Sequence, residues 1–271
     1  MAILNTTPDS FSDGGDNADL ANALASAIEH IESGVDIIDI GGMSTRPGAA
    51  DVEEEEEISR VVPVIEAIRL RNSTIAISVD TFRPRVAHAA ITAGATIIND
   101  VLGGSTDGML EVMATLDVPV ILMHSRGTPQ TMSKLTQYPQ GVVEGVREEL
   151  GGRVRNTLAA GVKRWNIIVD PGIGFAKTGE DNVVLLKDLS SLLSSDPSTT
   201  PTSAAFPSLV GLSRKKFLGS LTGKDNPKER VWATAAAVTA SIAAGADIVR
   251  IHDVKEMLDV VRVSDAIYRK L

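Results

Sequence analysis

Polar and charged side chains stand at the ends of short apolar runs along the whole sequence. These runs are rich in Val, Ile and Leu, and they lead into Asn5, Thr45, Arg46, Asp80, Asn99, His124, Asp170, Lys215, Arg250 and His252. Each residue alone is weak evidence, because a strand-ending Asp or Asn often caps the next helix and a single His usually packs or hydrogen-bonds. Ten such residues at equivalent positions predict one shared pocket.

Three of these residues have the chemistry of an anion site. Arg250 and His252 are two residues apart in an extended run, which places them on one face of a predicted strand. Together with Arg46 they could bind phosphate oxygens, since the arginine fork donates two parallel hydrogen bonds. We therefore expect a phosphate or diphosphate ligand rather than a single carboxylate.

A second group, made of Asp80, Asn99, Asp170 and Lys215, combines hydrogen-bond donors and acceptors. Such a mixture suits the edge of a flat heterocycle that carries several polar groups. A buried carboxylate such as Asp170 is costly unless it is paired, so a ligand that donates two N–H groups to it would be favoured. The alternative interpretation is an internal network of ion pairs.

Oxygen-bearing residues near the start of the chain could serve a metal ion. Asn5, Asp9 and Asp13 could contribute ligands to Mg²⁺ that also binds diphosphate oxygens. The glycine-rich motifs of nucleotide hydrolysis and dinucleotide binding do not follow any predicted strand, and no His/Glu cluster has the spacing of a zinc site. These function classes therefore lose support.

The composition limits the possible partners and compartments. A net charge of −9 disfavours a nucleic-acid or anionic-membrane surface, because either needs a basic face. The absence of cysteine excludes disulfides and thiolate metal sites. The most apolar stretch, 231–246, is shorter than the ~18 residues of a membrane span, and no signal peptide is recognisable. We expect a cytoplasmic protein, or a mitochondrial one if the source is a eukaryote.

The elements that position these side chains repeat along the sequence. A glycine precedes several apolar runs, in 34–39, 94–100, 161–170 and 245–250, and glycine readily adopts the positive φ found at helix ends. Eight such strands alternating with helices predict one α/β domain over residues 1–271, a (β/α)₈ TIM barrel with its active site at the C-terminal strand ends. A doubly wound open sheet is the alternative, although it would concentrate ligand residues at one switch point.

Three local patterns give further predictions. The Ser/Thr/Pro-rich segment 194–203 is typical of a surface insertion. Five consecutive glutamates, 53–57, indicate the solvated first turn of a helix. Residues 183–193 are predicted to form a single helix.

On these motifs, the chain resembles the dihydropteroate synthases of folate biosynthesis, which sulfonamides inhibit, along essentially its whole length. The matching segments are 3–15, 41–48, 78–81, 98–100, 170–175, 213–215 and 250–254. The resemblance implies a transferase that condenses 7,8-dihydropterin-6-ylmethyl diphosphate with 4-aminobenzoate to 7,8-dihydropteroate and releases diphosphate, with Mg²⁺ as cofactor. The pterin cation formed by C–O cleavage would be captured by the arylamine, so no protein nucleophile is required.

The resemblance also implies roles for individual residues. The pterin site would be formed by Asp80, Asn99, Met123, Asp170, Phe175 and Lys215. The diphosphate site would be formed by Asn5, which would also bind the metal, Arg46, Arg250 and His252. The 4-aminobenzoate site would be formed by Phe11, Thr45, Pro47, Phe175 and Ser213. The catalytic residues would be Asp80, Lys215, Arg250 and His252.

Departures from the common pattern are similar to those of fungal forms. Many relatives have Glu at the position of Met43, and many bacterial ones have Ser at that of Lys216. In fungi the synthase is fused behind other folate-pathway enzymes, so we expect a domain of a multifunctional enzyme. Two other functions stay open, a corrinoid methyltransferase that uses methyltetrahydrofolate and a catalytically inactive pterin-binding module. The apolar faces of 231–244 and of the last helix suggest a homodimer.

Overall fold

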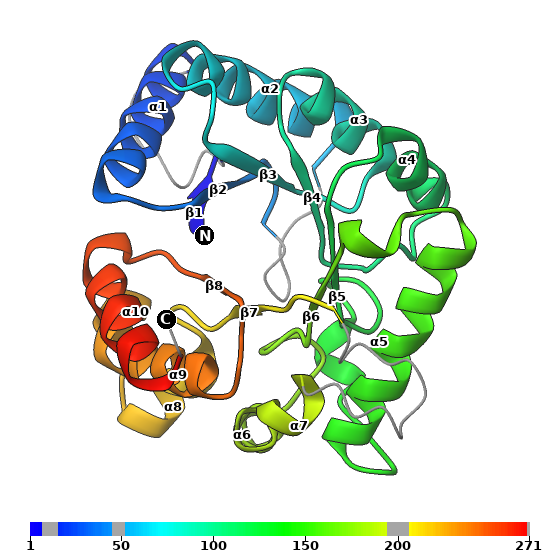
Figure 1. The fold of residues 1–271 in the computed structure, drawn as a ribbon, viewed down its shortest axis with the longest axis vertical. Coiled ribbons are helices and arrows are strands. Elements are labelled where there is room, and N and C mark those ends of the chain that lie inside the picture. Colours follow the sequence, from blue (N-terminus) through cyan, green and yellow to red (C-terminus); the bar gives the residue numbers. More distant parts are fainter. Residues whose placement is uncertain (7–15, 45–51, 194–205, 270–271) are drawn as a thin grey trace.

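The computed structural model describes residues 1–6, 16–44, 52–193 and 206–269, with only the backbone for 16–19. Within these ranges, short parallel strands form a ring that helices surround (Figure 1). The strands are β1 (Ala2–Asn5), β2 (Ile37–Gly41), β3 (Ala76–Asp80), β4 (Ile97–Asp100), β5 (Val120–Met123), β6 (Ile167–Asp170), β7 (Leu209–Gly211) and β8 (Ile248–Arg250).

Helices follow the strands in alternation, as the repeating pattern predicts. They are α1 (Asp16–Ser33), α2 (Glu54–Arg71), α3 (Pro84–Thr92), α4 (Met109–Leu116), α5 (Val142–Ala159), α6 (Gly179–Lys187), α7 (Leu189–Leu193), α8 (Lys216–Thr222), α9 (Val231–Ala243) and α10 (Val254–Tyr268). The predicted helix 183–193 is thus two helices, because α6 ends at Lys187 and α7 begins at Leu189. The predicted insertion 194–203 lies outside the described residues.

Backbone pairing closes the strands into a barrel. Strands β1 to β6 pair in order as one parallel sheet, and β7 pairs with β8. Two isolated parallel bridges, Val169 with Ser208 and Ala2 with Ile251, join these two sheets at both junctions. At the second junction, Ile3 donates its N–H to the carbonyl of Ile251 over 2.9 Å. The chain is therefore the predicted (β/α)₈ barrel, and the open doubly wound sheet is excluded.

The two ends of the barrel differ in polarity. Where the strands begin, the side chains of Met1, Ile97, Ile121 and Leu209 form a buried apolar cluster. Toward the carboxyl ends of the strands, buried polar residues appear instead, among them Asp39, Asp80, Asn99 and Asp170. Burying such groups is costly without partners, so the polar end is where a ligand or an internal network must compensate them.

The predicted solvated acidic turn is correct only in part. Glu55 stands out from the first turn of α2 with its side chain 72% exposed, but the side chain of Glu57 is fully buried and pairs with Arg83 Nη1 at 3.0 Å. Glu57 faces inward because helical spacing places it on the same stripe as Val61 and Ile68. None of the helices within the described ranges is long and apolar enough to cross a membrane.

Candidate functional site

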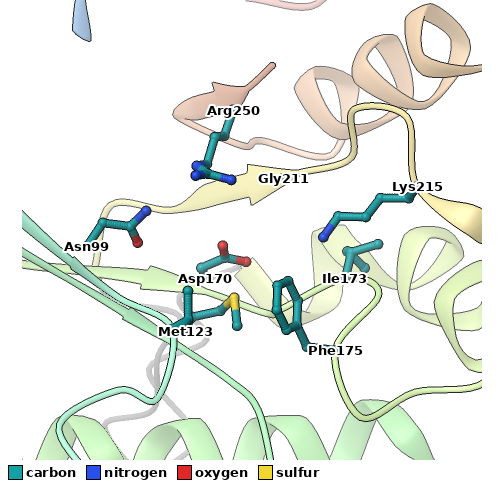
Figure 2. A pocket seen from close by; sticks show the side chains of 9 residues that line it. Asn99, Met123, Asp170, Ile173, Phe175, Gly211, Lys215 and Arg250 are labelled. Atoms are coloured by element: carbon teal, nitrogen blue, oxygen red, sulfur yellow. The ribbon is translucent and has the colours of Figure 1, made fainter. Parts of the chain in front are cut away.

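The carboxyl ends of five strands, β4 to β8, surround one pocket (Figure 2). Six of its lining residues were predicted from the sequence: Asn99, Met123, Asp170, Phe175, Lys215 and Arg250. The structure adds three, Val101, Ile173 and Gly211. The convergence expected from strand-ending polar residues is thus confirmed for this part of the site.

Arg250, at the end of β8, joins side chains from β2 and β3 beside the pocket. Its Nε donates to Asp39 Oδ2 over 2.6 Å, and its Nη2 donates to Asp80 Oδ2 over 2.7 Å. Asn99 Nδ2 donates to the same Asp39 oxygen over 3.2 Å. We call these four residues, Asp39, Asp80, Asn99 and Arg250, the Arg250 cluster.

Asp39 is a member of this cluster that sequence reasoning missed. It lies within β2 between apolar residues and is fully buried, so it needed a cationic partner from elsewhere in the chain. The available signal was a carboxylate inside an otherwise apolar strand, Ile37-Ile38-Asp39-Ile40. Asp36, at the foot of the same strand, is exposed.

Asp80 has one carboxylate oxygen paired and one unpaired. Burial raises the pKa of Asp80 to about 7, while the charge of Arg250 opposes that rise and the charge of Asp39 adds to it. Its Oδ1 is buried and has no hydrogen-bond partner within the described structure. A buried acceptor in this condition is costly, so a ligand N–H that reached Oδ1 would be bound favourably.

Asp170 and Lys215 supply charge on the opposite side of the pocket. Asp170 Oδ1 accepts the N–H of Gly172 over 2.7 Å, and burial raises the pKa of its carboxyl to about 6. Lys215 precedes α8, and its Nζ lies 4.2 Å from the centre of the Phe175 ring. Figure 2 shows Asp170, Phe175 and Lys215 directed into the same space. This side of the pocket therefore offers a carboxylate, an ammonium group and an aromatic face.

Two residues of the predicted anion site, Arg250 and His252, lie within the described structure. Arg250 turns into the barrel toward Asp39 and Asp80, and their charges raise its pKa against the opposing effect of burial. His252 lies just beyond β8, where its Nδ1 is 3.0 Å from Ser213 Oγ. The same hydroxyl accepts the backbone N–H of His252 over 3.0 Å. The expectation that Arg250 and His252 form one phosphate site therefore stays a prediction.

Several predicted residues of the diphosphate and 4-aminobenzoate sites lie outside the described residues. These are Phe11, Thr45, Arg46 and Pro47. Asn5, the predicted metal ligand, ends β1 next to β2: a Cβ on Gly41 would lie 3.8 Å from Asn5 Oδ1 and 3.9 Å from Asp80 Oδ2. Asn5 thus faces the same end of the barrel as the Arg250 cluster.

This chain is similar to known proteins in sequence and in fold. The family described as pterin binding enzyme matches residues 1–252. The folic acid synthesis protein fol1 of Schizosaccharomyces pombe is 48% identical over 98% of this chain, and this chain spans about a third, 36%, of that relative's length. A dihydropteroate synthase of Synechocystis is 47% identical over 99% of this chain and 90% of its own length.

A solved structure shares the fold at high similarity. The dihydropteroate synthase of Xanthomonas albilineans with 4-aminobenzoic acid is 40% identical, with a TM-score of 0.89. The match covers 100% of this chain and 93% of that one.

Proposed function

This chain belongs to the pterin binding enzyme family, and we therefore propose that it catalyses the dihydropteroate synthase reaction. In this reaction, 4-aminobenzoate displaces diphosphate from 7,8-dihydropterin-6-ylmethyl diphosphate to give 7,8-dihydropteroate. The relatives that match over most of their own length support this reaction, and they give no support to a corrinoid methyltransferase.

One observation carries the proposal, namely the unpaired oxygen of Asp80 beside the pocket. Asp80 Oδ1 requires a donor, while Asn99, Asp170 and Lys215 add two acceptors and two donor groups within the same strand ends. A pterin ring offers amine and ring N–H donors next to carbonyl and ring nitrogen acceptors on one flat edge. The two patterns are complementary, which favours the heterocycle interpretation over a closed network of ion pairs.

The chemistry follows from where the charges lie. Cleavage of the C–O bond to diphosphate leaves positive charge on the pterin, and the arylamine nitrogen then forms the new C–N bond and loses a proton. Asp170 and Asp80 place negative charge around the pterin and so stabilise that cation as it forms. The Phe175 ring and Met123 provide apolar surface that holds the heterocycle in position and excludes water that could trap the cation.

The family implies Mg²⁺, and the described residues offer only a few of the oxygen ligands that this ion needs. Within the described ranges, no group of three or more His, Cys, Asp or Glu side chains could hold a metal ion. Asn5 Oδ1 offers one hard oxygen ligand at the correct end of the barrel. Mg²⁺ characteristically takes few protein ligands and completes its shell with water and substrate phosphates. When bound, the ion would neutralise charge on the departing diphosphate.

The proposal is tested by diphosphate release from the pterin substrate with Mg²⁺ and 4-aminobenzoate, omitting each component in turn. We expect diphosphate to be released only when all components are present, and dihydropteroate to be formed at the same time. Asp170→Asn should lower kcat/KM about ten- to a hundredfold, because a hydrogen bond to a charged group is lost. Asp188→Asn, an exposed aspartate that follows α6, is the matched control and should not change it. Tight pterin binding without release would favour an inactive module.

The assembly and the compartment belong to the same proposal. The fungal relatives are about three times the length of this chain, which supports fusion to other folate-pathway domains. Trp232 on α9 and Val263 and Ile267 on α10 are largely exposed apolar side chains, which supports a homodimer through these helices. Sedimentation of the purified protein tests the dimer, and imaging of the tagged full-length protein tests the expected cytoplasmic or mitochondrial location.

A further inference from the structure

A lysine is buried directly behind the pocket. Lys177 follows the Asp170–Phe175 turn and is 9% exposed. Its Nζ lies 2.9 Å from three acceptors: the carbonyl oxygens of Gly172 and Phe175 and the ring nitrogen His124 Nδ1. An ammonium group has three N–H donors, so each donor is matched.

The histidine beside it is held in one protonation state. Burial and the nearby charge of Lys177 lower the pKa of His124 to about 3, so the ring is neutral at ordinary pH. Because Nδ1 accepts from Lys177, the ring proton must be on Nε2, which lies 3.0 Å from Glu149 Oε2. Glu149 thereby selects the tautomer that Lys177 requires.

The outer side of this network is covered by two further residues. Arg126 Nε donates to Glu149 over 3.0 Å, and the Arg126 guanidinium lies 3.8 Å from the centre of the Tyr138 ring. Tyr138 in turn donates its hydroxyl hydrogen to the carbonyl of Ala176 over 3.0 Å. This cover keeps Lys177 and His124 away from water. Their hydrogen bonds are stronger in the protein interior than they would be in water.

The turn held by Lys177 is the one that presents two pocket residues. Gly172 donates its N–H to Asp170 and accepts from Lys177 through its carbonyl, so a single residue connects the lysine to the carboxylate. The carbonyl of Phe175, whose ring lines the pocket, is the second backbone acceptor. Gly172 has φ +66°, and a Cβ there would lie 1.9 Å from the His124 carbonyl oxygen, so the turn is pressed against β5.

From this geometry we infer that Lys177 is a positioning residue for the pterin site. It fixes the Asp170–Phe175 turn, and so sets where the Asp170 carboxylate and the Phe175 ring meet the heterocycle. His124 and Glu149 act through it. The inference rests on the proposed function and adds residues that lie outside the pocket lining.

The charges around Lys177 give this role a pH signature. Burial lowers the pKa of Lys177 to about 7, with Asp170 and Glu149 opposing that effect and Arg153 and Lys215 adding to it. The neutral amine has two donors for three acceptors and no longer lowers the pKa of Asp170 by its charge. Pterin affinity should therefore fall as the pH rises above about 7. On the acid side it should rise with pH as Asp170 and Asp80 ionise.

The first test replaces the lysine by a side chain of similar length without charge. Titration calorimetry with dihydropterin diphosphate and Mg²⁺, without 4-aminobenzoate, should show that Lys177→Met binds about tenfold to a hundredfold more weakly. The alkaline fall in affinity should disappear in this variant, while the acid-side rise remains. Lys255→Met, an exposed lysine on α10, should bind as the parent does.

A second pair of variants keeps the test decisive if Lys177→Met does not fold. Glu149→Gln and Glu149→Leu both lose the ion pair with Arg126, but only glutamine retains an acceptor for His124 Nε2–H. Since Lys177 still donates to Nδ1, the Nε2–H tautomer should be kept in all three proteins. Nitrogen NMR of labelled histidine should show the signature of a hydrogen-bonded Nε2–H in the parent and in Glu149→Gln, and loss of that signature in Glu149→Leu. Pterin affinity should fall with the signature.

The outcomes separate the two proposals. A parent protein that does not bind dihydropterin diphosphate would overturn the proposed function, and the inference with it. A parent that binds, beside a folded Lys177→Met variant with unchanged affinity and unchanged pH profile, would overturn the positioning role alone. Identical affinities in Glu149→Leu and Glu149→Gln would likewise overturn the part assigned to His124 and Glu149.

Discussion

Two buried charged clusters lie at the polar end of the barrel, and they differ in how completely their hydrogen bonds are made. In the Arg250 cluster, one guanidinium serves two carboxylates, and Asp80 Oδ1 is left without a partner in the described structure. In the Lys177 cluster, formed by His124, Glu149 and Lys177, three ammonium donors meet three acceptors, and both histidine nitrogens are engaged. The first cluster is incomplete, and the second is closed.

This difference separates binding from support. A buried polar atom without a partner loses free energy until a ligand supplies one, so the Arg250 cluster is suited to contact substrate. A closed network gains nothing from a ligand, but it fixes the backbone around it. Charge alone would not have distinguished them, since each cluster contains a cationic side chain and at least one carboxylate.

The largest effect should come from removing the cation of the incomplete cluster. Arg250→Ala leaves Asp39 and Asp80 buried without their partner, which should lower the free energy of unfolding by about 3–5 kcal/mol and abolish turnover. Arg85 also contacts two carboxylates, Glu54 and Glu55, but it is 62% exposed, so Arg85→Ala should change stability by less than about 1 kcal/mol. Urea unfolding measures both. Equal effects of the two substitutions would remove the distinction between the clusters and the surface.

The support given by the Lys177 cluster should be most sensitive at Gly172, whose carbonyl accepts from Lys177. Gly172→Ala places a side chain at positive φ and against the His124 carbonyl, and should lower the free energy of unfolding by about 3 kcal/mol or more. Gly34 also has positive φ, yet nothing lies within 4 Å of its missing Cβ. Gly34→Ala should therefore show only the conformational part, about 1–2 kcal/mol. If the two variants unfold at the same denaturant concentration, the turn is not pressed against β5 as described.

The smallest effects are in the pH dependence of stability. As the pH rises, one cluster should lose stability and the other should gain it. Burial raises the folded-state pKa of Asp80 from 3.8 to about 7. The contribution of Asp80 to the free energy of unfolding is therefore present below about pH 4 and is lost as the pH rises to 7. Burial alone would raise the pKa of Glu149, but hydrogen bonds from His124 and Arg126 outweigh it and lower the pKa from 4.5 to about 2. The contribution of Glu149 to the free energy of unfolding is present above about pH 4.5 and is lost as the pH falls to 2.

Paired variants make this contrast measurable. Relative to the parent, Asp80→Asn should gain stability as the pH rises from 4 to 7, whereas Glu149→Gln should lose stability as the pH rises from 2 to 4.5. Denaturant unfolding across this pH range, with acid-denatured samples excluded, checks both slopes. Slopes of the same sign would show that the two clusters are not electrostatically different.

Much of the fold and part of the site could be predicted from the sequence, because both depend on local patterns. Glycine, apolar run and polar end recur at intervals that fit helix and strand lengths, and this repetition predicts the barrel and the end at which Asp80, Asn99, Asp170 and Lys215 gather. A phosphate beside Arg250 stays a prediction of the sequence, but the pairing of Arg250 with Asp39, which is 211 residues away, could not be predicted from local patterns.

The amino-acid sequence was enough to infer the family and the residues that reach the polar end of the barrel. It also predicts the order of strands and helices, apart from the division of 183–193 between α6 and α7. The pairing of these groups could be read only from the folded chain. Asp80 has one buried oxygen without a partner in the described structure, whereas both oxygens of Asp39 accept hydrogen bonds. Lys215 lines the pocket, whereas Lys177 lies behind it. The physical reason is that burial and hydrogen-bond partners come from distant segments brought together by barrel closure. The type of a residue shows which hydrogen bonds it can make, and its neighbours in the folded chain show which of those hydrogen bonds are already made.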